Sequence, residues 1–472
     1  MTVVVVGAGP VGVTAALLLA RQGVPTILLE RHEDVFPLPR AVAVDDEVQR
    51  VLQAAGVAEA FAAISRPSRG LRLVDARHRV IAEFARSPLG AHGFPQTSMF
   101  DQPALERVLR DELARQPLCE LRSGVEVVAV REGSVTYLRD GVATTVEADA
   151  VLGCDGANSL TRHAIGASWH DFGFAEEWTV VDVRTDAAVR CWEGVDQVCD
   201  PRRPATFMRI GEDRYRWEFR LTGEADDARI RRLVAPWTRP APDEKFEVVR
   251  KARYTFRARV ADRWRHGRVF LLGDAAHQTP PFVGQGLCAG LRDAANLTWK
   301  LALVLRGADE RLLDTYEAER SPHVRRVIRT AVAAGWAMTG GQDRAAAVRH
   351  MATAALCRLP GVPGLVTRDR AVPRGPLSRG TTCPQPRVGG RPLDDLLGSS
   401  FAVVARELTP GVQAIATAMG APVVQARELD EWLAAGRLDA ALIRPDRTVL
   451  DVVPAGAGEF TGVAGWARLV SA

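Results

Sequence analysis

The chain has 472 residues, of which 47% are hydrophobic and 25% are charged, and its formal net charge is +4. This composition is typical of a globular protein and excludes disordered and collagen-like chains. The length predicts two to four domains of about 100 to 200 residues each. The 61 basic and 57 acidic residues form no polybasic block, so we expect no nucleic-acid partner.

The cysteines and the apolar segments indicate the cellular compartment. The seven cysteines include no C-x-x-C pair, which is typical of reduced thiols. The longest apolar stretch, residues 11–20, is too short to cross a bilayer, and residues 3–6 lack the basic segment of a signal peptide. We therefore expect a cytoplasmic protein that makes no membrane contact.

The first thirty residues predict a βαβ unit. Residues 3–6 form a buried strand, residues 13–22 a helix and residues 24–29 a second strand that ends at Glu30. Between the first two lies a turn in which Gly7 allows a tight bend, Gly9 lets a pyrophosphate approach, and Gly12 lets helix and strand pack closely. This pattern predicts binding of an adenine dinucleotide, although a glycine turn can also arise by accident, and it does not distinguish FAD from NAD.

Two later segments carry acids at the ends of predicted strands. Residues 151–159 include Asp155 in an Asp-Gly pair before a helix start, and Arg162 follows. Residues 269–277 form a buried strand that ends in Gly273 and Asp274. Two prolines and a Gly-Gln-Gly sequence then precede a long helix from about residue 287.

These three motifs, in this order and spacing, resemble the single-component flavoprotein aromatic hydroxylases of the para-hydroxybenzoate hydroxylase class. The segments 200–207, 215–220, 254–256 and 293–301 look like the branch that contains 3-(3-hydroxyphenyl)propionate hydroxylase. One departure is Arg257, which stands where that branch is expected to have a histidine. The resemblance covers residues 1 to about 335 well and the remainder loosely.

The resemblance implies noncovalently bound FAD and a set of residues that contact it. Asp155 is expected to connect the sheet to the flavin site as much as to contact FAD directly. Cys288 is expected to be a small buried residue rather than a redox group. Each of two further residues has a purely structural alternative role: Arg40 could form a surface salt bridge, and Gln102 could make a contact at a helix start. The implied FAD-binding residues are Gly7, Gly9, Pro10, Val11, Gly12, Glu30, Arg31, Arg40, Gln102, Val127, Asp155, Gly273, Asp274, Pro281, Gly284, Gln285, Gly286, Leu287 and Cys288.

The segment 171–263 alternates with period two and predicts a sheet over the flavin, with strands at 178–184, 206–210, 215–221 and 248–256. We expect some of its aromatic side chains to line an aromatic-binding cavity, although packing in the core is the simpler reading. The candidate substrate-binding residues are Phe207, Trp217, Phe219, Tyr254 and Pro280. No catalytic residue is assigned, and His277 is read as a hydrogen-bonding loop residue rather than a base.

The predicted fold class is α/β, or α+β overall. It comprises a Rossmann-like FAD-binding domain, an inserted antiparallel substrate domain, and a thioredoxin-like C-terminal domain without C-x-x-C. The expected boundaries are 1–74, 99–170 and 264–335 for the FAD-binding domain, 75–98 and 171–263 for the substrate domain, 336–390 for a connecting segment, and 391–472 for the C-terminal domain.

The function expected from this resemblance is an FAD-dependent monooxygenase that uses NADH or NADPH and O2 to hydroxylate a phenol through a flavin C4a-hydroperoxide. The substrate could be a 3-hydroxyphenylpropionate-like acid or an aromatic natural-product intermediate. A flavin halogenase is a second enzyme alternative, but the W-x-W-x-I-P signature expected of that class is missing from this chain. The non-enzyme alternative is an FAD-binding escort protein without catalytic turnover. No metal is expected, because the nine histidines are not spaced like metal ligands. A homodimer is one possible assembly.

Overall fold

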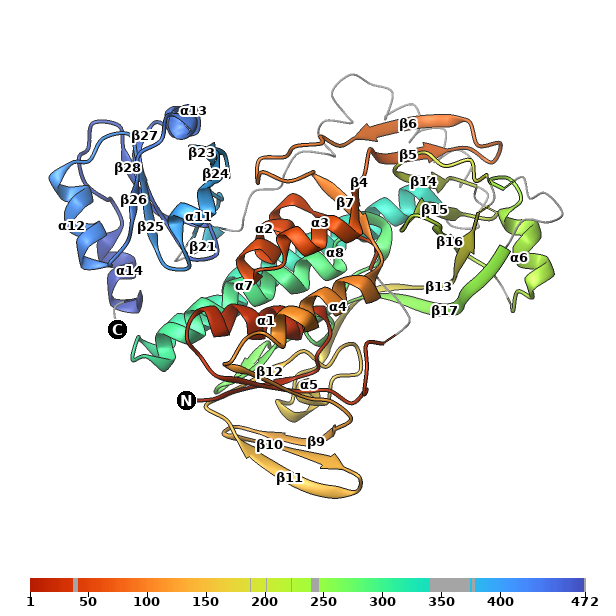
Figure 1. Cartoon of the computed structure of the whole chain (residues 1–472), viewed down its shortest axis with the longest axis horizontal. Helices are drawn as coiled ribbons and strands as arrows, with labels where there is room; N and C mark the ends of the chain where they lie inside the picture. Colours follow the sequence, from red (N-terminus) through yellow and green to blue (C-terminus); the bar gives the residue numbers. More distant parts are fainter. Residues whose placement is uncertain are drawn as a thin grey trace.

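The computed structural model describes residues 1–36, 41–186, 188–200, 202–221, 223–238, 246–339, 374–375 and 378–470. Figure 1 shows a larger body built from the described residues before 340 and a smaller unit, in blue, formed by the described residues from 374 onward. We call this smaller part the C-terminal unit.

A six-stranded sheet, in the order β18-β19-β12-β1-β2-β8, forms the centre of the larger body. All its pairings are parallel except that of the edge strand β18. The predicted strand 3–6 is confirmed, whereas the first helix begins three residues earlier than predicted, because Pro10 suits the first helical position. The strands are β1 (Val3–Val6), β2 (Thr26–Leu29), β8 (Cys119–Arg122), β12 (Ala150–Gly153), β18 (Arg265–His266) and β19 (Val269–Leu271).

Helices cover one face of this sheet, and a short helix with a three-stranded meander covers the other (Figure 1). The first group is α1 (Pro10–Arg21), α2 (Asp46–Ala55), α3 (Ala58–Ile64), α4 (Gln102–Leu113), α7 (Gly286–Leu305) and α8 (Asp314–Thr339). The second is α5 (Leu160–Ala164), β9 (Glu126–Arg131), β10 (Ser134–Arg139) and β11 (Val142–Glu147). A small sheet of β3 (Ala43–Asp45), β7 (Thr97–Phe100) and β4 (Ser65–Pro67) lies beside α2 and α3.

An eight-stranded sheet extends from the larger body, in the order β20-β17-β13-β16-β15-β14-β5-β6. Its two long strands pair from Trp169↔Ala261 to Thr185↔Phe246, so they reach well beyond the predicted segments 178–184 and 248–256. A register shift between Asp171 and Ala175 lets the pair continue past an irregularity. The strands are β5 (Gly70–Val74), β6 (Val80–Ala85), β13 (Trp169–Thr185), β14 (Val195–Val198), β15 (Ala205–Arg209), β16 (Arg214–Phe219), β17 (Phe246–Ala261) and β20 (His277–Gln278).

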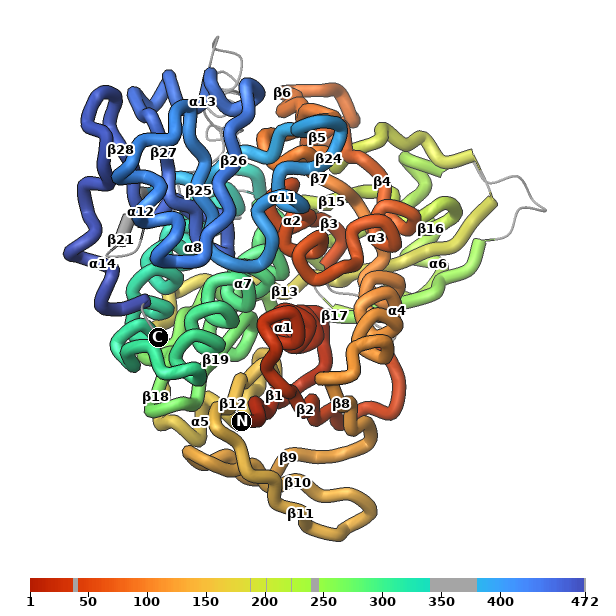
Figure 2. The backbone as a smooth tube through the Cα atoms, turned by 60° about the vertical axis from the view of Figure 1, so that its left-hand side comes forward, coloured from red at the N-terminus to blue at the C-terminus, as the bar shows by residue number. Residues whose placement is uncertain are grey.

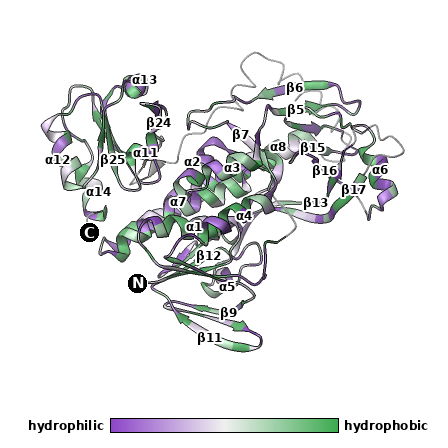
Figure 3. Ribbon diagram, in the orientation of Figure 1, coloured by the Kyte–Doolittle hydropathy of each residue, from purple (hydrophilic) through white to green (hydrophobic). Residues whose placement is uncertain are grey.

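Helix α6 (Asp227–Val234) covers one face of this sheet. Hydrophobic and hydrophilic residues alternate along it (Figure 3), and Ile230, Leu233 and Val234 are buried. These side chains share a core with aromatic residues of β15 and β16. The opposite face is also buried, so the strands of this sheet have no solvent-facing side at their centre.

The C-terminal unit contains the sheet β26-β25-β27-β28, in which β25 is parallel to β26 and the other pairs are antiparallel. One helix joins the parallel pair and another follows the last strand, which is the topology of the thioredoxin fold and confirms that prediction. The elements are β21 (Arg374–Gly375), β22 (Ser378–Arg379), β23 (Arg387–Val388), β24 (Arg391–Pro392), α11 (Leu393–Leu397), β25 (Ala402–Ala405), α12 (Pro410–Ala418), β26 (Val423–Val424), α13 (Asp430–Ala435), β27 (Leu438–Ile443), β28 (Val449–Pro454) and α14 (Val463–Val470).

Buried ion pairs join this unit to the larger body, beside α7 and α8 (Figure 2). Arg444 donates to both carboxylate oxygens of Glu319, at 2.8 and 3.0 Å, and Lys300 Nζ lies 3.0 Å from the same residue. Burial lowers the pKa of Lys300 to about 8. Burial alone would raise the pKa of Glu319, but the charges of Arg444 and Lys300 lower it below its ordinary value. Glu319 is therefore ionised and holds two cations from two parts of the chain.

Replacement of Glu319 by alanine should destabilise the protein strongly, because it leaves two buried cations short of a carboxylate. We expect a loss of about 3 to 5 kcal/mol in the free energy of unfolding. The control is Glu310→Ala, which removes an exposed carboxylate that also pairs with two arginines and should cost at most about 1 kcal/mol. Thermal and denaturant unfolding measure both. Equal losses would show that the buried cluster contributes no more than a surface pair.

Candidate active site

The first glycine loop lies between β1 and α1. Gly7 has φ +98°, and a Cβ there would lie 2.5 Å from the carbonyl oxygen of Cys154. A Cβ on Gly12 would lie 2.0 Å from the carbonyl oxygen of Gly7, so these two positions require glycine. Gly9 has no described atom within 4 Å of its Cβ position, and no side chain caps the helix that begins at Pro10. The loop therefore offers free amides to open space at the positive end of a helix dipole.

Glu30 and its neighbours stabilise this loop from the next strand. Glu30 is 8% exposed, and its carboxylate accepts from the backbone amides of Ala8, at 2.8 Å, and His32, at 3.0 Å. Arg31 is exposed, and its Nε lies 3.3 Å from His32 Nε2. Val127, on β9, is half-buried against the main core.

Asp155 organises the turn after β12. Its carboxylate accepts from the hydroxyl of Ser159 at 2.5 Å, and from the amide and hydroxyl of Thr161 at 2.9 and 3.0 Å. Arg162, from the same motif, donates to the carbonyls of Ala157 and Ala275 at 3.3 Å and so ties the second motif to the third. These contacts agree with a partly structural role for Asp155.

The third motif rests on a buried carboxylate. Gly273 and Asp274 form a single 3-10 turn, η1 (Gly273–Ala275), directly after β19. Asp293, on α7, is fully buried and accepts from the Gly273 amide at 3.1 Å, while its other oxygen accepts from Arg320 Nε at 2.8 Å. His277 Nε2 lies 2.7 Å from Asp293, so His277 makes a hydrogen bond as predicted, and whether it also acts as a base stays untested. Burial would raise the pKa of Asp293, but the charges of His277 and Arg320 lower it.

The loop before α7 combines a short 3-10 helix, η2 (Pro281–Val283), with glycines that face open space. Gly284 has φ +63°, and no described atom lies within 4 Å of the Cβ positions of Gly284 or Gly286. No side chain caps α7, and its first turn carries no acid. Leu287 is half-buried, whereas Cys288 is fully buried, and burial raises the pKa of its thiol. A protonated, buried Cys288 fits the interpretation of this residue as a small buried side chain rather than a redox group.

An ion-pair network holds this loop against β3 and α2. Arg292 donates to Gln285 Oε1 at 3.1 Å, to Asp45 at 2.7 Å and to Glu47 at 2.6 Å. Gln285 in turn donates to Asp45 at 3.1 Å. Sequence reasoning missed Asp45, Glu47 and Arg292, because partners about 245 residues apart leave no local pattern. The Gly-Gln-Gly loop is thus held by charged residues from two distant parts of the chain, Asp45 and Glu47 before it and Arg292 after it.

Gln102 stabilises the chain just after residue 40. Its Oε1 accepts from the amide of Ala41 at 2.7 Å, and its Nε2 donates to Glu106 at 2.7 Å. Arg40, predicted to contact the centre of FAD, lies outside the described residues, so its role stays a prediction.

The aromatic residues proposed for substrate binding occupy two different places. Phe207, Trp217 and Phe219 are at most 1% exposed and pack in the core beneath α6. Phe207 and Trp217 stack with ring centroids 4.9 Å apart. This is the core-packing alternative, and their contact with substrate stays a prediction. Pro280 directly precedes η2.

The other face of the same strands carries buried charges. Arg216 donates to both oxygens of Asp182, at 2.6 and 2.9 Å, and Arg250 Nη1 lies 3.5 Å from Asp182. Burial and the charge of Arg216 lower the pKa of Arg250 to about 10. Burial raises the pKa of Glu218, which lies beside these arginines. We call these four residues the polar face of the sheet.

The polar face continues toward the loop before α7 through aromatic residues. Tyr254 accepts a hydrogen bond from Arg250 and is paired in register with Trp178 of β13. The Trp178 ring contacts Phe282 of η2, with centroids 5.9 Å apart. Because Trp178 and Asp182 are four residues apart on one strand, they lie on the same face. Of the predicted substrate residues, the structure therefore places Tyr254 on the side that borders the glycine loop.

The three motifs together fit a bound FAD. The ends of β1, β12 and β19 are adjacent in the sheet, and the first and third motifs carry glycines that leave open space at uncapped helix starts. Such amides suit a pyrophosphate and the negatively charged edge of a reduced flavin. Among the described residues no group of histidine, cysteine or acidic side chains could hold a metal ion, and no helix is long and apolar enough to span a membrane.

Comparison with known proteins shows the family. Residues 1–331 match the model of the FAD binding domain family. The chain is 35% identical to a protein of Rhodococcus jostii (strain RHA1), named a probable NADH-specific resorcinol 4-hydroxylase, over 98% of this chain and 93% of the relative. It is 36% identical to the 3-(3-hydroxy-phenyl)propionate/3-hydroxycinnamic acid hydroxylase of Mycobacterium sp. (strain KMS), over 98% of this chain and 84% of the relative.

Solved structures share the whole architecture. The anhydrotetracycline hydroxylase of Streptomyces rimosus is 26% identical with a TM-score of 0.78, and the match covers 100% of this chain and 99% of that chain. A complex of aklavinone-11 hydroxylase, at 24% identity and a TM-score of 0.81, covers 99% and 98% of the two chains and shows the fold. The chain therefore belongs to the FAD-binding family of aromatic hydroxylases and is a flavoprotein monooxygenase.

Proposed function

We propose that the protein hydroxylates a small phenolic acid of the 3-hydroxyphenylpropionate type, with NADH as the reductant. The observation that carries this proposal is the polar face, where two buried arginines, Arg216 and Arg250, share Asp182. Glu218 lies on the same face, and burial raises its pKa above the ordinary value. The two guanidinium groups are suited to an anionic group on the substrate. The relative named for 3-(3-hydroxy-phenyl)propionate supports this substrate class, and the relative named an NADH-specific resorcinol hydroxylase supports the reductant and a phenolic ring.

The glycine motifs would hold the cofactor, and the polar face would hold the substrate. We propose that the amides around Gly9 and Gly286 bind the pyrophosphate and the flavin, and that Asp274 accepts from the ribityl chain. Bound FAD, once reduced by the nicotinamide, supplies the oxygen activation that side chains lack. The chain's own part is to orient the ring beside Trp178 and Phe282, to exclude water, and to hold the carboxylate of the substrate at Arg250, beside Tyr254.

A tailoring hydroxylase for a polycyclic aromatic natural product is the second candidate. It is favoured by the likeness to the anhydrotetracycline hydroxylase over the whole chain. Arg257, in place of the histidine expected for the 3-hydroxyphenylpropionate branch, points the same way.

Turnover with a panel of phenols tests the function. We expect the purified protein to release FAD on acid precipitation, and to oxidise NADH faster, with a product 16 mass units heavier, when 3-(3-hydroxyphenyl)propionate is added. Resorcinol and a polycyclic phenol are the comparison substrates. Hydroxylation of the polycyclic phenol alone would favour the second candidate. A protein that no phenol stimulates, or that requires halide for product, would contradict both.

The variant Arg250→Met tests how the substrate is recognised. If Arg250 binds the carboxylate, its loss should raise the KM for 3-(3-hydroxyphenyl)propionate at least about tenfold, which is the value of about 1.5 kcal/mol for a charged hydrogen bond. The KM for resorcinol, which has no carboxylate, should change little. The control is Arg253→Met on the same strand, an exposed arginine that pairs with Glu177 at 2.7 Å. Equal increases for both substrates would show that Arg250 does not read the carboxylate.

A further inference from the structure

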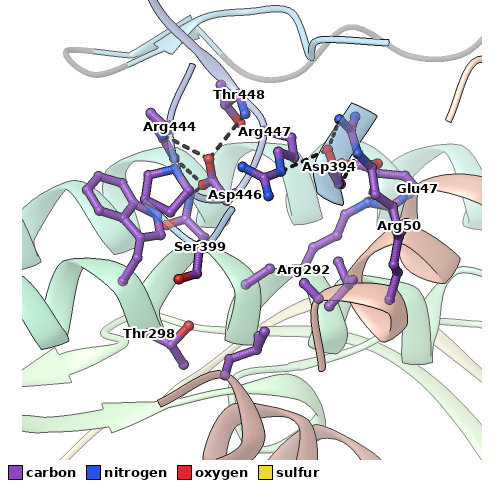
Figure 4. Close-up of a pocket in the computed structure, with 18 of the residues that line it drawn as sticks. Glu47, Arg50, Arg292, Thr298, Asp394, Ser399, Arg444, Asp446, Arg447 and Thr448 are labelled. Carbon is purple, nitrogen blue, oxygen red and sulfur yellow. Dashed lines mark hydrogen bonds and ion pairs between the residues drawn. The ribbon is translucent and has the colours of Figure 1, made fainter. Parts of the chain in front are cut away.

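One buried carboxyl in the larger body lacks the partners that other buried charges have. In the cavity between the larger body and the C-terminal unit (Figure 4), for example, Arg447 lies 3.0 Å from Asp394, and Arg444 pairs with Asp446. Glu218, on β16, is only 8% exposed, yet no described residue forms a hydrogen bond or a close ion pair with its carboxylate. Its hydrogen-bonding capacity is therefore unused within the described part of the chain.

The oxygens of Glu218 reach open space. Some buried side-chain atoms of the described residues are both enclosed and unpaired, among them Trp217 Nε1 on the same strand, but neither oxygen of Glu218 is one of them. Because these oxygens are unpaired and not enclosed, they keep accessible surface although the residue as a whole is buried. A ligand can therefore reach this carboxylate.

The open space at Glu218 is on the side of the sheet that borders the loop before α7. Met208 of β15 lies on the same face as Glu218 and packs in one cluster with Ala43 of β3. On the other side of Glu218, Arg220 donates to the carbonyl of Thr339, at the end of α8, at 3.3 Å. Glu218 thus lies between two contacts that join the polar face to the elements around the glycine loop.

The surroundings of Glu218 favour its neutral form more than water does. Burial raises the pKa of Glu218 and the charge of Asp182 raises it further, while Arg216 and Arg250 oppose this only in part. A carboxylate with a raised pKa is a better proton acceptor near neutral pH than an exposed one. The titratable and charged side chains of this face on β13, β16, β17 and the start of α4 are Asp101, Glu176, Asp182, Arg214, Arg216, Arg220, Arg250 and Tyr254.

Glu218 and Arg250 lie on opposite sides of β13. Val180 of β13 is in register with Glu218 of β16 on one side and with Ala252 of β17 on the other. Glu218 and Arg250 are therefore two strands apart, a separation of about 10 Å across the sheet. Between them the face carries the small apolar side chains of Val180 and Ala252, over which an aromatic ring can lie. A substrate with its acid group at Arg250 would point the far edge of its ring toward Glu218.

We propose that Glu218 binds the phenolic hydroxyl of the substrate and takes its proton while the ring is hydroxylated. This inference rests on the proposed placement of the substrate carboxylate at Arg250. The O–H bond breaks, the proton joins a carboxylate oxygen of Glu218, and the electron pair stays on the phenolic oxygen, which makes the ring more nucleophilic. When the hydroxylated carbon then loses its hydrogen to solvent as a proton, Glu218 returns its own proton to the phenolic oxygen.

Ligand binding to the oxidised, FAD-loaded protein tests the hydroxyl contact without turnover. Isothermal titration calorimetry compares 3-(3-hydroxyphenyl)propionate with 3-phenylpropionate, which lacks only the hydroxyl. The wild type should bind the hydroxylated acid at least about tenfold more tightly, as expected for a hydrogen bond to a charged acceptor. Glu218→Leu should abolish this preference, whereas Glu218→Gln should keep part of it, because its amide oxygen still accepts. The control Glu247→Gln, which changes an exposed carboxylate of β17, should behave like the wild type.

Turnover separates the hydrogen bond from the proton transfer. Glutamine cannot take the proton, so Glu218→Gln should lower kcat at least about a hundredfold, with 3-(3-hydroxyphenyl)propionate and with resorcinol alike. The remaining activity should rise with pH, because the phenol must then ionise unaided. In the wild type the activity should instead level off above the pKa of Glu218.

Two results would overturn the role of Glu218 and leave the proposed function standing. One is an equal preference for the hydroxylated acid in the wild type, Glu218→Gln and Glu218→Leu. The other is a wild-type kcat in Glu218→Gln protein that carries its full complement of FAD. A wild type that hydroxylates resorcinol but binds neither propionate would contradict the proposed substrate instead, and the kcat of Glu218→Gln with resorcinol would then decide the role of Glu218.

Discussion

The buried carboxylate of Asp293 is the group on which the geometry of the FAD site depends. It lies on α7, is fully buried, and binds the Gly273 amide, His277 and Arg320. Through these contacts one side chain joins the turn after β19, the edge strand β20 and helix α8. A buried charge is costly unless it is paired and hydrogen-bonded, so this arrangement holds the surrounding elements in one relative position.

The neighbouring residue on α7 extends this constraint in the other direction. Arg292 ties the loop before α7 to Asp45 and Glu47, so the two ends of the loop between Gly273 and Gly286 are each held by one charged residue of the same helix. The loop between them brings Phe282 against Trp178 of the eight-stranded sheet. The glycine loops and the contact between Phe282 and the sheet are therefore positioned by adjacent residues of one helix.

The parts of the fold that depend on local pattern could be predicted. The run of four valines, the glycine turn and Glu30 predict the βαβ unit, and the family resemblance implies the thioredoxin-like sheet after residue 391. The face of the eight-stranded sheet that borders the loop before α7 could not be identified in this way. Phe207, Trp217 and Phe219 alternate with Arg216 and Glu218, and because both faces are buried, alternation does not reveal which one borders the flavin loop. Asp45 and Arg292 meet only in three dimensions.

The dissociation constant of FAD for the variant Asp293→Asn tests this account most directly. Asparagine preserves the shape and can still accept from the Gly273 amide, but it removes the charge that His277 and Arg320 face. The account predicts that FAD binds at least about tenfold more weakly, a change of about 1.4 kcal/mol, while the far-ultraviolet circular dichroism stays that of the wild type. Unchanged FAD affinity in a folded Asp293→Asn protein would contradict it.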